Sequence, residues 1–149
     1  MKRANAAGIP KQVSADRAIS ARQRFSGSLP LAQLPRLAAQ LADNSGSLEV
    51  EFEAGKDASG AAWLGGEVRG TLRLTCQRGL HPFDWGCAVK TRLRLVSSEV
   101  EEARVLKDSE PYRVQDDVLP VRELVEDEVL LALPIAPRCD DPDCVERLK

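Results

Sequence analysis

Aromatic residues and histidine are scarce in this sequence. Phe, Trp and Tyr together make up 4% of the 149 residues, and His81 is the one histidine. The core must therefore be built mainly from Leu, Val and Ala. With one histidine in an expected loop, the sequence offers no Ser/His/Asp order of a hydrolase, and a Cys76–His81 pair is only a weak indication of a nucleophile. The glycines near residue 65 fit neither phosphate-binding loop pattern. We therefore expect no enzymatic activity and no small-molecule substrate.

Long hydrophobic runs are also absent. No stretch approaches the roughly 20 apolar residues that a membrane-spanning helix needs, and the N-terminal segment MKRANAAGIPKQV lacks the apolar run of a secretion signal. We expect a cytoplasmic protein with no membrane partner. In that compartment, the four cysteines are more readily explained as thiols or metal ligands than as disulfides.

The formal net charge is only -2, but the charges are unevenly distributed along the chain. Residues 69–94 contain six basic side chains and one acidic side chain, whereas residues 95–149 contain 15 acidic and seven basic side chains. Such segregation is typical of a basic binding face beside an acidic one.

Three segments alternate apolar and polar residues with the period of two that predicts strands: residues 47–53, 67–74 and 85–96. The apolar members of each segment would lie on one buried face, which is typical of an antiparallel sheet. Residues 17–25 and 112–114 are weaker candidates for strands. The rest of the acidic stretch 97–118 is expected to contain a mobile loop.

Leucines at helical spacing predict two helices. The first covers residues 31–42, with Pro35 tolerated only near its start, and the second covers residues 121–133, where Pro134 and Pro137 stop it. A chain with 43% hydrophobic and 30% charged residues is most simply one globular domain. The sequence therefore predicts a single α+β domain in which an antiparallel sheet of about four to six strands packs against two helices.

Two segments carry a family resemblance: LTCQRGLHPF at residues 74–83 and VRELVEDEVLLALPIAPRCDDPDC at residues 121–144. Together they resemble the YceD family, the large ribosomal RNA subunit accumulation proteins of bacteria. The resemblance implies a single YceD-like domain over residues 17–144, followed by a short tail 145–149. Residues 1–16 precede it and are expected to be mobile, because they lack periodicity. It also implies a non-enzymatic role in the accumulation of large-subunit (23S) ribosomal RNA, and hence in ribosome assembly.

The family pattern also suggests a metal site. Cys76, Cys139 and Cys144 match positions where the family offers three sulfurs and one imidazole, a set that suits tetrahedral zinc. This chain has Gly79 where the family usually has the second cysteine of a Cys-x-x-Cys pair, and Cys139 where it often has histidine. A fourth ligand would be His81 or Cys87, although Cys87 shares the apolar face of its strand and is better explained as a core residue. The alternative is that all four cysteines are reduced structural thiols.

Basic side chains on two predicted strands are candidate RNA contacts. If segments 67–74 and 85–96 pair as neighbours, their basic residues share one sheet face, and planar guanidinium groups suit phosphate recognition. The candidates are Arg73, Arg78, Lys90, Arg92 and Arg94, with Arg78 in the loop between the strands. The opposing explanation is that three glutamates of segment 47–53 neutralise this face. The usual aromatic platform for single-stranded RNA is absent from these strands.

The acidic triplet Glu126, Asp127 and Glu128 lies within the second predicted helix. Glu126 and Asp127 are expected to point outward as a docking site for a basic ribosomal protein or an assembly factor. Glu128 is expected at the edge of the apolar stripe, where an arginine would be its partner. The alternative is a solvated acidic face with one internal salt bridge.

Two functions follow from these observations. The first is a binding factor in large-subunit biogenesis, whose partners are the large-subunit ribosomal RNA or its assembly intermediates and a basic ribosomal protein. The second is a small zinc-binding adaptor that contacts proteins and makes no direct contact with RNA.

Overall fold

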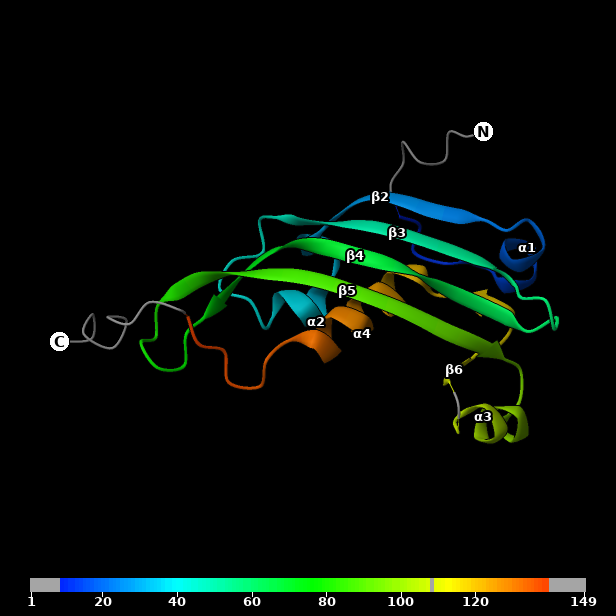
Figure 1. Cartoon of the computed structure of the whole chain (residues 1–149). Coiled ribbons are helices and arrows are strands. Elements are labelled where there is room, and N and C mark those ends of the chain that lie inside the picture. Colours follow the sequence, from blue (N-terminus) through cyan, green and yellow to red (C-terminus); the bar gives the residue numbers. More distant parts are fainter. Residues whose placement is uncertain (1–8, 108, 140–149) are drawn as a thin grey trace.

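A five-stranded sheet organises the residues that the computed structural model describes, 9–107 and 109–139 (Figure 1). Its strands lie in the order β2 (Arg24–Pro30), β3 (Ser47–Lys56), β4 (Ala62–Thr75), β5 (Pro82–Val96) and β6 (Glu110–Arg113). Strands β2 to β5 pair antiparallel, whereas β6 pairs parallel with the end of β5. A second sheet joins β1 (Val13–Ser14) to β7 (Val118–Leu119). The fold is α+β, as predicted, with a sheet that is mostly antiparallel.

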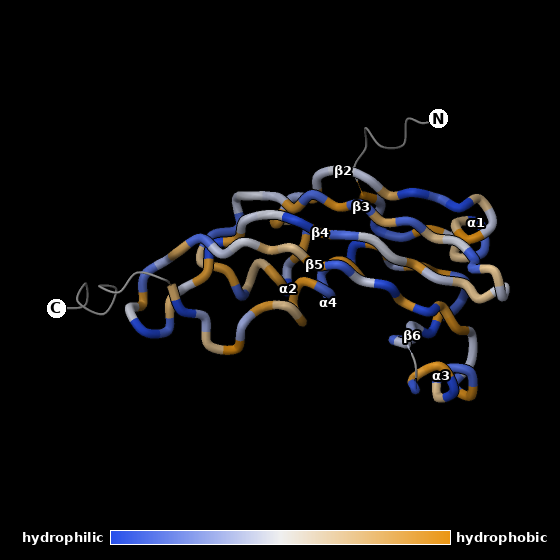
Figure 2. Tube along the Cα trace, viewed as in Figure 1, coloured by the Kyte–Doolittle hydropathy of each residue, from blue (hydrophilic) through white to orange (hydrophobic). Residues whose placement is uncertain are grey.

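The strands form where apolar and polar residues alternate, because successive side chains of a strand point to opposite faces. In β3, Leu48, Val50 and Phe52 are buried while Glu49 and Glu51 are exposed. Figure 2 shows the same change between hydrophobic and hydrophilic residues along the sheet. The three predicted strands are confirmed, and each is longer than its alternating segment.

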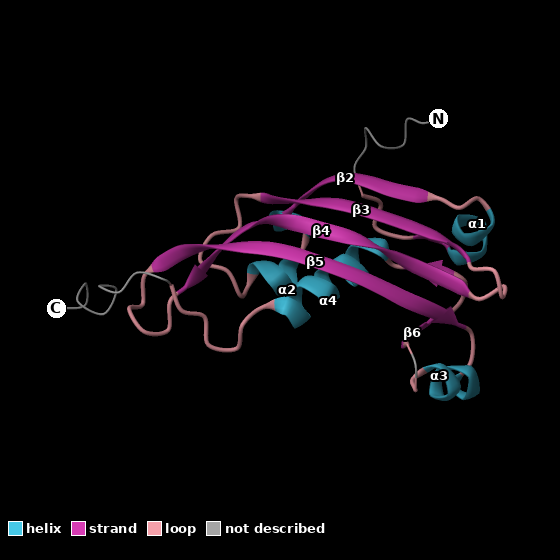
Figure 3. Ribbon diagram, viewed as in Figure 1, coloured by secondary structure: helices cyan, strands magenta, loops and turns pink. Residues whose placement is uncertain are grey.

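Four α-helices accompany the sheet in the described ranges: α1 (Ala15–Ser20), α2 (Pro35–Ala38), α3 (Glu99–Val105) and α4 (Val121–Ala132). Figures 1 and 3 show α2 and α4 together under one face of the sheet, with α1 and α3 toward one end of it. The predicted helix at 121–133 is confirmed as α4. None of the described helices is long and apolar enough to cross a membrane.

The first predicted helix is shorter than expected. Residues 31–33 form one turn of 3-10 helix, and α2 then covers only four residues. Pro35 separates the two because it has no N–H to continue the hydrogen bonding of a preceding helix. Residues 17–25, predicted as a strand, instead contain most of α1 and the beginning of β2.

Two further segments differ from the prediction. Helix α3 occupies part of the stretch expected to be a loop, and it begins with the oxygen of Ser98 accepting the Glu101 N–H at 3.1 Å. Residues 9–16, expected to be mobile, belong to the fold because Ile9 is buried and β1 pairs with β7. Residues 1–8 and the predicted tail 145–149 lie outside the described residues.

Glu126 is buried, contrary to the prediction that it points outward. It is only 4% exposed, because α4 packs against α2 as well as against β5. One carboxylate oxygen accepts the Leu37 N–H at 2.9 Å, and the other lies 3.0 Å from Nη2 of Arg36. Oδ1 of Asp127 lies 2.7 Å from Nη2 of the same guanidinium, and the Asp127 side chain stays 41% exposed. The expected internal salt bridge therefore exists, but it belongs to Glu126 rather than to Glu128.

This contact gives a backbone N–H at the start of α2 a hydrogen-bond acceptor from a distant part of the chain. Leu34 precedes α2 and makes no side-chain capping bond, while Pro35 at the first position has no N–H. The Leu37 N–H is therefore one of the donors that a helix start leaves without an internal partner. Glu126, 89 residues further along the chain, supplies the missing acceptor. We call this arrangement of Glu126, Arg36 and the Leu37 N–H the carboxylate lock.

We expect Glu126→Ala to lower the free energy of unfolding by about 2–4 kcal/mol, because it leaves a buried N–H unpaired and removes a charged acceptor. Asp127→Ala is the matched control: its half-exposed ion pair is worth less than about 1 kcal/mol. Urea denaturation of the two variants and the parent measures both effects. Equal losses in the two variants would show that the lock is no more than a surface ion pair.

Candidate functional site

The sheet face that α2 and α4 leave uncovered, here called the outer face, carries the candidate site (Figure 3). Strand register places side chains of neighbouring strands in rows across it. Glu49 of β3 pairs with Arg69 of β4, and Glu67 of β4 pairs with Lys90 of β5. On this face the acidic residues concentrate on β3 and the basic residues on β5.

Lys90, Arg92 and Arg94 occupy alternate positions of β5, so their side chains project together from the outer face. We call these three residues the basic row. The prediction that they share one face is confirmed. None of them forms a salt bridge with an acidic side chain in the described part of the protein. The basic row is therefore the part of the outer face best suited to contact phosphates.

Arg73 and Arg78, the other two predicted RNA contacts, lie apart from the basic row. Nη1 of Arg73 is 3.0 Å from Oδ1 of Asp84, near the opposite end of the β4–β5 pair. Arg78 lies in the turn after β4, where its Nη2 donates to the backbone oxygen of Cys139 at 3.4 Å. Both guanidinium groups are engaged within the protein, so the five predicted contacts do not form one patch.

Neutralisation by the glutamates of β3, the alternative explanation for the outer face, applies to part of it. The register places Glu49 opposite Arg69 and Glu53 opposite Arg24. Arg69 also lies 3.8 Å from the carboxylate of Glu67. The compensation is incomplete, because Glu51 lies opposite Glu67, and Glu67 in turn lies opposite Lys90 of the basic row.

An aromatic residue stands on the outer face, where none was expected. Trp63 belongs to β4 and pairs with Arg94, and the guanidinium carbon of Arg92 lies 4.5 Å from the centre of its ring. This distance is that of a cation–π contact. The sequence prediction missed Trp63 because it began the strand at residue 67. The period of two, continued backwards from Glu67, would have placed Trp63 on the same face.

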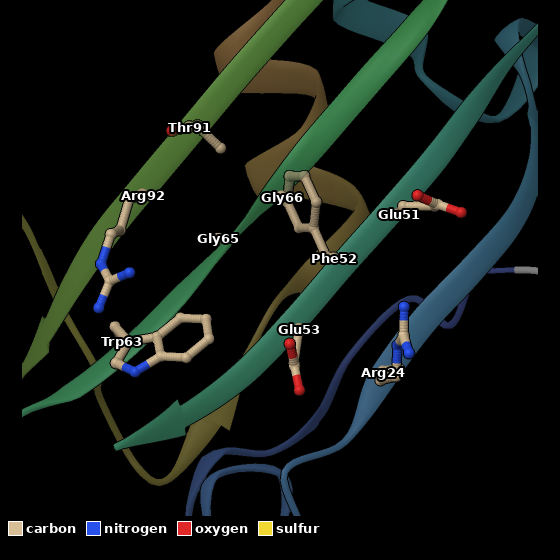
Figure 4. Close-up of a pocket in the computed structure, with 9 residues that line it drawn as sticks. All are labelled: Arg24, Glu51, Phe52, Glu53, Trp63, Gly65, Gly66, Thr91 and Arg92. Carbon is tan, nitrogen blue, oxygen red and sulfur yellow. The ribbon is translucent and has the colours of Figure 1, made fainter. Parts of the chain in front are cut away.

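A groove of about 300 Å³ lies next to Trp63 on the outer face (Figure 4). Its floor is the backbone of Gly65 and Gly66, which add no side chains to it. A Cβ at Gly66 would lie 1.9 Å from the backbone oxygen of Glu51, and the residue has a φ of +154°, which favours glycine. Arg24 and Glu53 stand on the other side, so the groove has an aromatic wall and a charged wall.

The two cysteine-containing segments meet, as predicted. Cys76 and Cys139 are both buried and pack together with Phe83, and the Gln77 N–H donates to the Pro137 oxygen at 2.8 Å. Burial acts to raise the pKa of the Cys76 thiol, but hydrogen bonds from Cys139 and from backbone N–H groups, that of Gly79 among them, lower it to about 6. The thiolate, which is the form that binds metals, is therefore favoured at neutral pH.

The remaining predicted metal ligands are distributed as follows. Cys87 belongs to the main core, as expected, and burial raises the pKa of its thiol. His81 follows the Cys76 turn, and its buried Nδ1 has no hydrogen-bond partner among the described residues. Cys144 lies outside them. Within the described ranges no three Cys, His, Asp or Glu side chains come close enough to hold a metal ion, so Cys76 and Cys139 contribute at most part of a zinc site.

Glu128 faces β5 rather than an arginine. It lies at a groove of about 360 Å³ between α4 and β6, together with Glu110 and Asp127. Its half-burial raises the pKa of its carboxyl group; a hydrogen bond from Thr91 opposes this shift, and the charges of Glu110 and Asp127 add to it. Among the described residues no arginine forms a salt bridge with Glu128, contrary to the prediction.

Comparison with known proteins gives one family. The family model described as "Large ribosomal RNA subunit accumulation protein YceD" matches residues 64–148, which is more than half of the chain. The matched region begins in β4, directly after Trp63, and contains the basic row, both cysteine segments and Glu126. No solved structure matches the chain.

Proposed function

Because the chain belongs to the YceD family of large ribosomal RNA subunit accumulation proteins, we propose that it supports accumulation or processing of the large-subunit (23S) ribosomal RNA by binding that RNA or its assembly intermediates. The family membership is the observation that carries this proposal. The description of the family names an accumulation role and no reaction. The proposed role is that of a cytoplasmic, non-enzymatic factor with no small-molecule substrate.

The basic row supports direct contact with RNA. Its three cations project from one open sheet face, and none is held by a salt bridge in the described part of the chain. Contacts between such side chains and phosphates release counterions and therefore weaken steeply as salt rises. Phosphate contacts position a nucleic acid without reading its sequence. In this proposal, β5 orients the RNA strand along the sheet.

A basic ribosomal protein is a second partner in the proposal. Asp127 remains a candidate protein contact because its side chain is 41% exposed. Glu126 is buried and is no longer a candidate. The groove between α4 and β6 places Glu110 and Glu128 beside Asp127. This acidic surface has the charge that a basic partner requires.

We expect Lys90→Gln with Arg94→Gln to weaken binding of single-stranded ribosomal RNA fragments about tenfold at moderate salt, because two phosphate contacts are lost. The slope of log affinity against log salt should fall by about 1.4. Filter binding over a salt series measures both quantities. Arg104→Gln with Lys107→Gln removes the same charge from the region of α3 and should leave both unchanged. Equal losses of RNA affinity in the two double variants would mean that the basic row acts only through the overall charge of the protein.

Depletion of the protein in its own cells should lower the ratio of large-subunit to small-subunit ribosomal RNA. A tagged copy should migrate with precursors of the large subunit in a sucrose gradient. Quantification of total RNA and immunoblotting of the gradient fractions test the two statements together. Normal RNA levels, with the tagged protein at the top of the gradient, would contradict the proposed function.

A zinc-binding adaptor without RNA contact is the second candidate function. The adjacency of Cys76 and Cys139 favours it, since these residues tie the turn after β4 to the segment that follows α4. A zinc ion held there would contribute folding free energy rather than catalysis. The ion would need further ligands, for which His81 and Cys144 are the candidates.

If this second function holds, elemental analysis of the full chain should find one zinc ion per molecule. Cys139→Ser should abolish the bound zinc, whereas Cys87→Ser, which alters a cysteine of the main core, should retain it. The same preparation should show no affinity for RNA. A protein that binds RNA and contains no zinc would eliminate the adaptor.

A further inference from the structure

The groove beside Trp63 has the chemistry of a nucleotide subsite. We propose that it receives one unpaired guanine base of the bound RNA, an inference that rests on the proposed function and adds base selectivity to it. The groove lies beside the basic row, so an RNA backbone that follows β5 passes directly along its edge. Its volume of about 300 Å³ suits a single small planar group.

Gly65 creates the space for the base. In the register of the sheet it lies between Glu53 of β3 and Arg92 of β5, at the centre of a row that is otherwise filled by side chains. A Cβ at this position would lie 2.9 Å from the backbone oxygen of Thr91, which is closer than real Cβ atoms approach, so a larger residue would not fit here without a shift of the backbone. The outer face therefore has a gap where its neighbouring positions carry long polar side chains, and Figure 4 shows the bare strand between the two walls.

Two planar groups in contact form one wall. Trp63 lies over Gly55 of the neighbouring strand, where an added Cβ would be 3.3 Å from Cζ2 of the indole ring. The Arg92 guanidinium lies over the same ring, with its central carbon 4.5 Å from the ring centre. Aromatic rings and guanidinium planes are the surfaces on which proteins stack unpaired RNA bases. The wall thus offers a stacking surface that is already held in place.

The opposite wall selects the base. Glu53 lines this wall, and a carboxylate can only accept hydrogen bonds. Guanine offers two adjacent donors, N1–H and the N2 amino group, which can meet the two oxygens of one carboxylate in parallel. Adenine and cytosine each place an acceptor nitrogen beside their amino group, and uracil places its single N–H between two carbonyls. A carboxylate opposite a stacking surface therefore favours guanine over the other three bases.

Charge on both sides of the groove accommodates the sugar and phosphates. Arg24 of β2 pairs in register with Glu53 and lines the same wall. It offsets the repulsion between Glu53 and the phosphate backbone. Lys90 and Arg94 flank Arg92 along β5 and continue the positive surface past the groove. The base occupies the gap at Gly65 while its phosphates remain near cations.

The test compares short single-stranded oligouridylates that carry one central guanine, adenine, cytosine or inosine. The guanine oligonucleotide should bind about tenfold more tightly than the others. Inosine lacks the N2 amino group and should lose most of that advantage. Fluorescence anisotropy of labelled oligonucleotides measures the affinities. Affinity independent of the central base would overturn the inference and leave the phosphate contacts of the proposed function intact.

Two substitutions locate the preference. Glu53→Gln should remove the advantage of guanine without weakening the other oligonucleotides, since it replaces a pure acceptor and removes a negative charge. Glu49→Gln is the matched control on the same strand and face, outside the groove, and should keep the preference. Trp63→Ala should weaken all oligonucleotides, and Trp63→Phe should restore part of the loss. An undiminished guanine preference in Glu53→Gln would refute the assigned role of Glu53.

Other outcomes separate this inference from the function it rests on. If no oligonucleotide binds at low salt, both the direct RNA contact and the guanine subsite are wrong. If binding responds to Lys90→Gln with Arg94→Gln but not to the central base, only the subsite is wrong. If free guanosine monophosphate binds as tightly as the guanine oligonucleotide, the occupant is a nucleotide rather than RNA.

Discussion

The carboxylate lock is the constraint on which the rest of the architecture depends. The carboxylate of Glu126 meets the N–H of Leu37 and the guanidinium of Arg36, and so attaches α4 to α2 across 89 residues of chain. A buried carboxylate is tolerated only when its oxygens are bonded, which allows α4 few other positions. Both helices are therefore held under one face of the sheet, and the opposite face of β2 to β5 stays open (Figure 1).

Acidic and basic side chains lie on different strands of the open face. On β3, Glu53 pairs in register with Arg24 of β2 and Glu49 with Arg69 of β4, which compensates part of that side. Within the described chain the basic row on β5 forms no salt bridge with an acidic side chain, although Glu67 of β4 lies opposite Lys90. On β4, which lies between β3 and β5, Gly65 has no side chain and Trp63 presents an aromatic ring. A sheet whose charge is nearly balanced can thus still present a local cationic edge beside an aromatic surface, a combination that the net charge of -2 does not reveal.

The fold was predictable where local periodicity decides the structure. The period of two located β3, β4 and β5, and it placed the basic row on one face; helical spacing located α4. Prediction failed where a residue distant in the sequence determines the environment of a side chain. A helix with one apolar stripe would expose Glu126, but α4 is contacted from two sides, so a second face is buried. Arg78 is engaged by Cys139, 61 residues away. Trp63 was missed for a local reason, because Gly65 and Gly66 separate it from the alternating segment that begins at residue 67.

The pairing of β1 with β7 has a consequence for synthesis on the ribosome. Each of the strands β2 to β5 pairs with its neighbour in the chain, so these strands can form as soon as they leave the exit tunnel. The beginning of the chain, by contrast, waits for Val118 and Leu119, and α2 waits for Glu126. Until then the nascent sheet displays its apolar underside to water. Such exposed surfaces are the ones that chaperones recognise and that aggregate first, so the last fifth of the chain determines when this protein becomes safe to release.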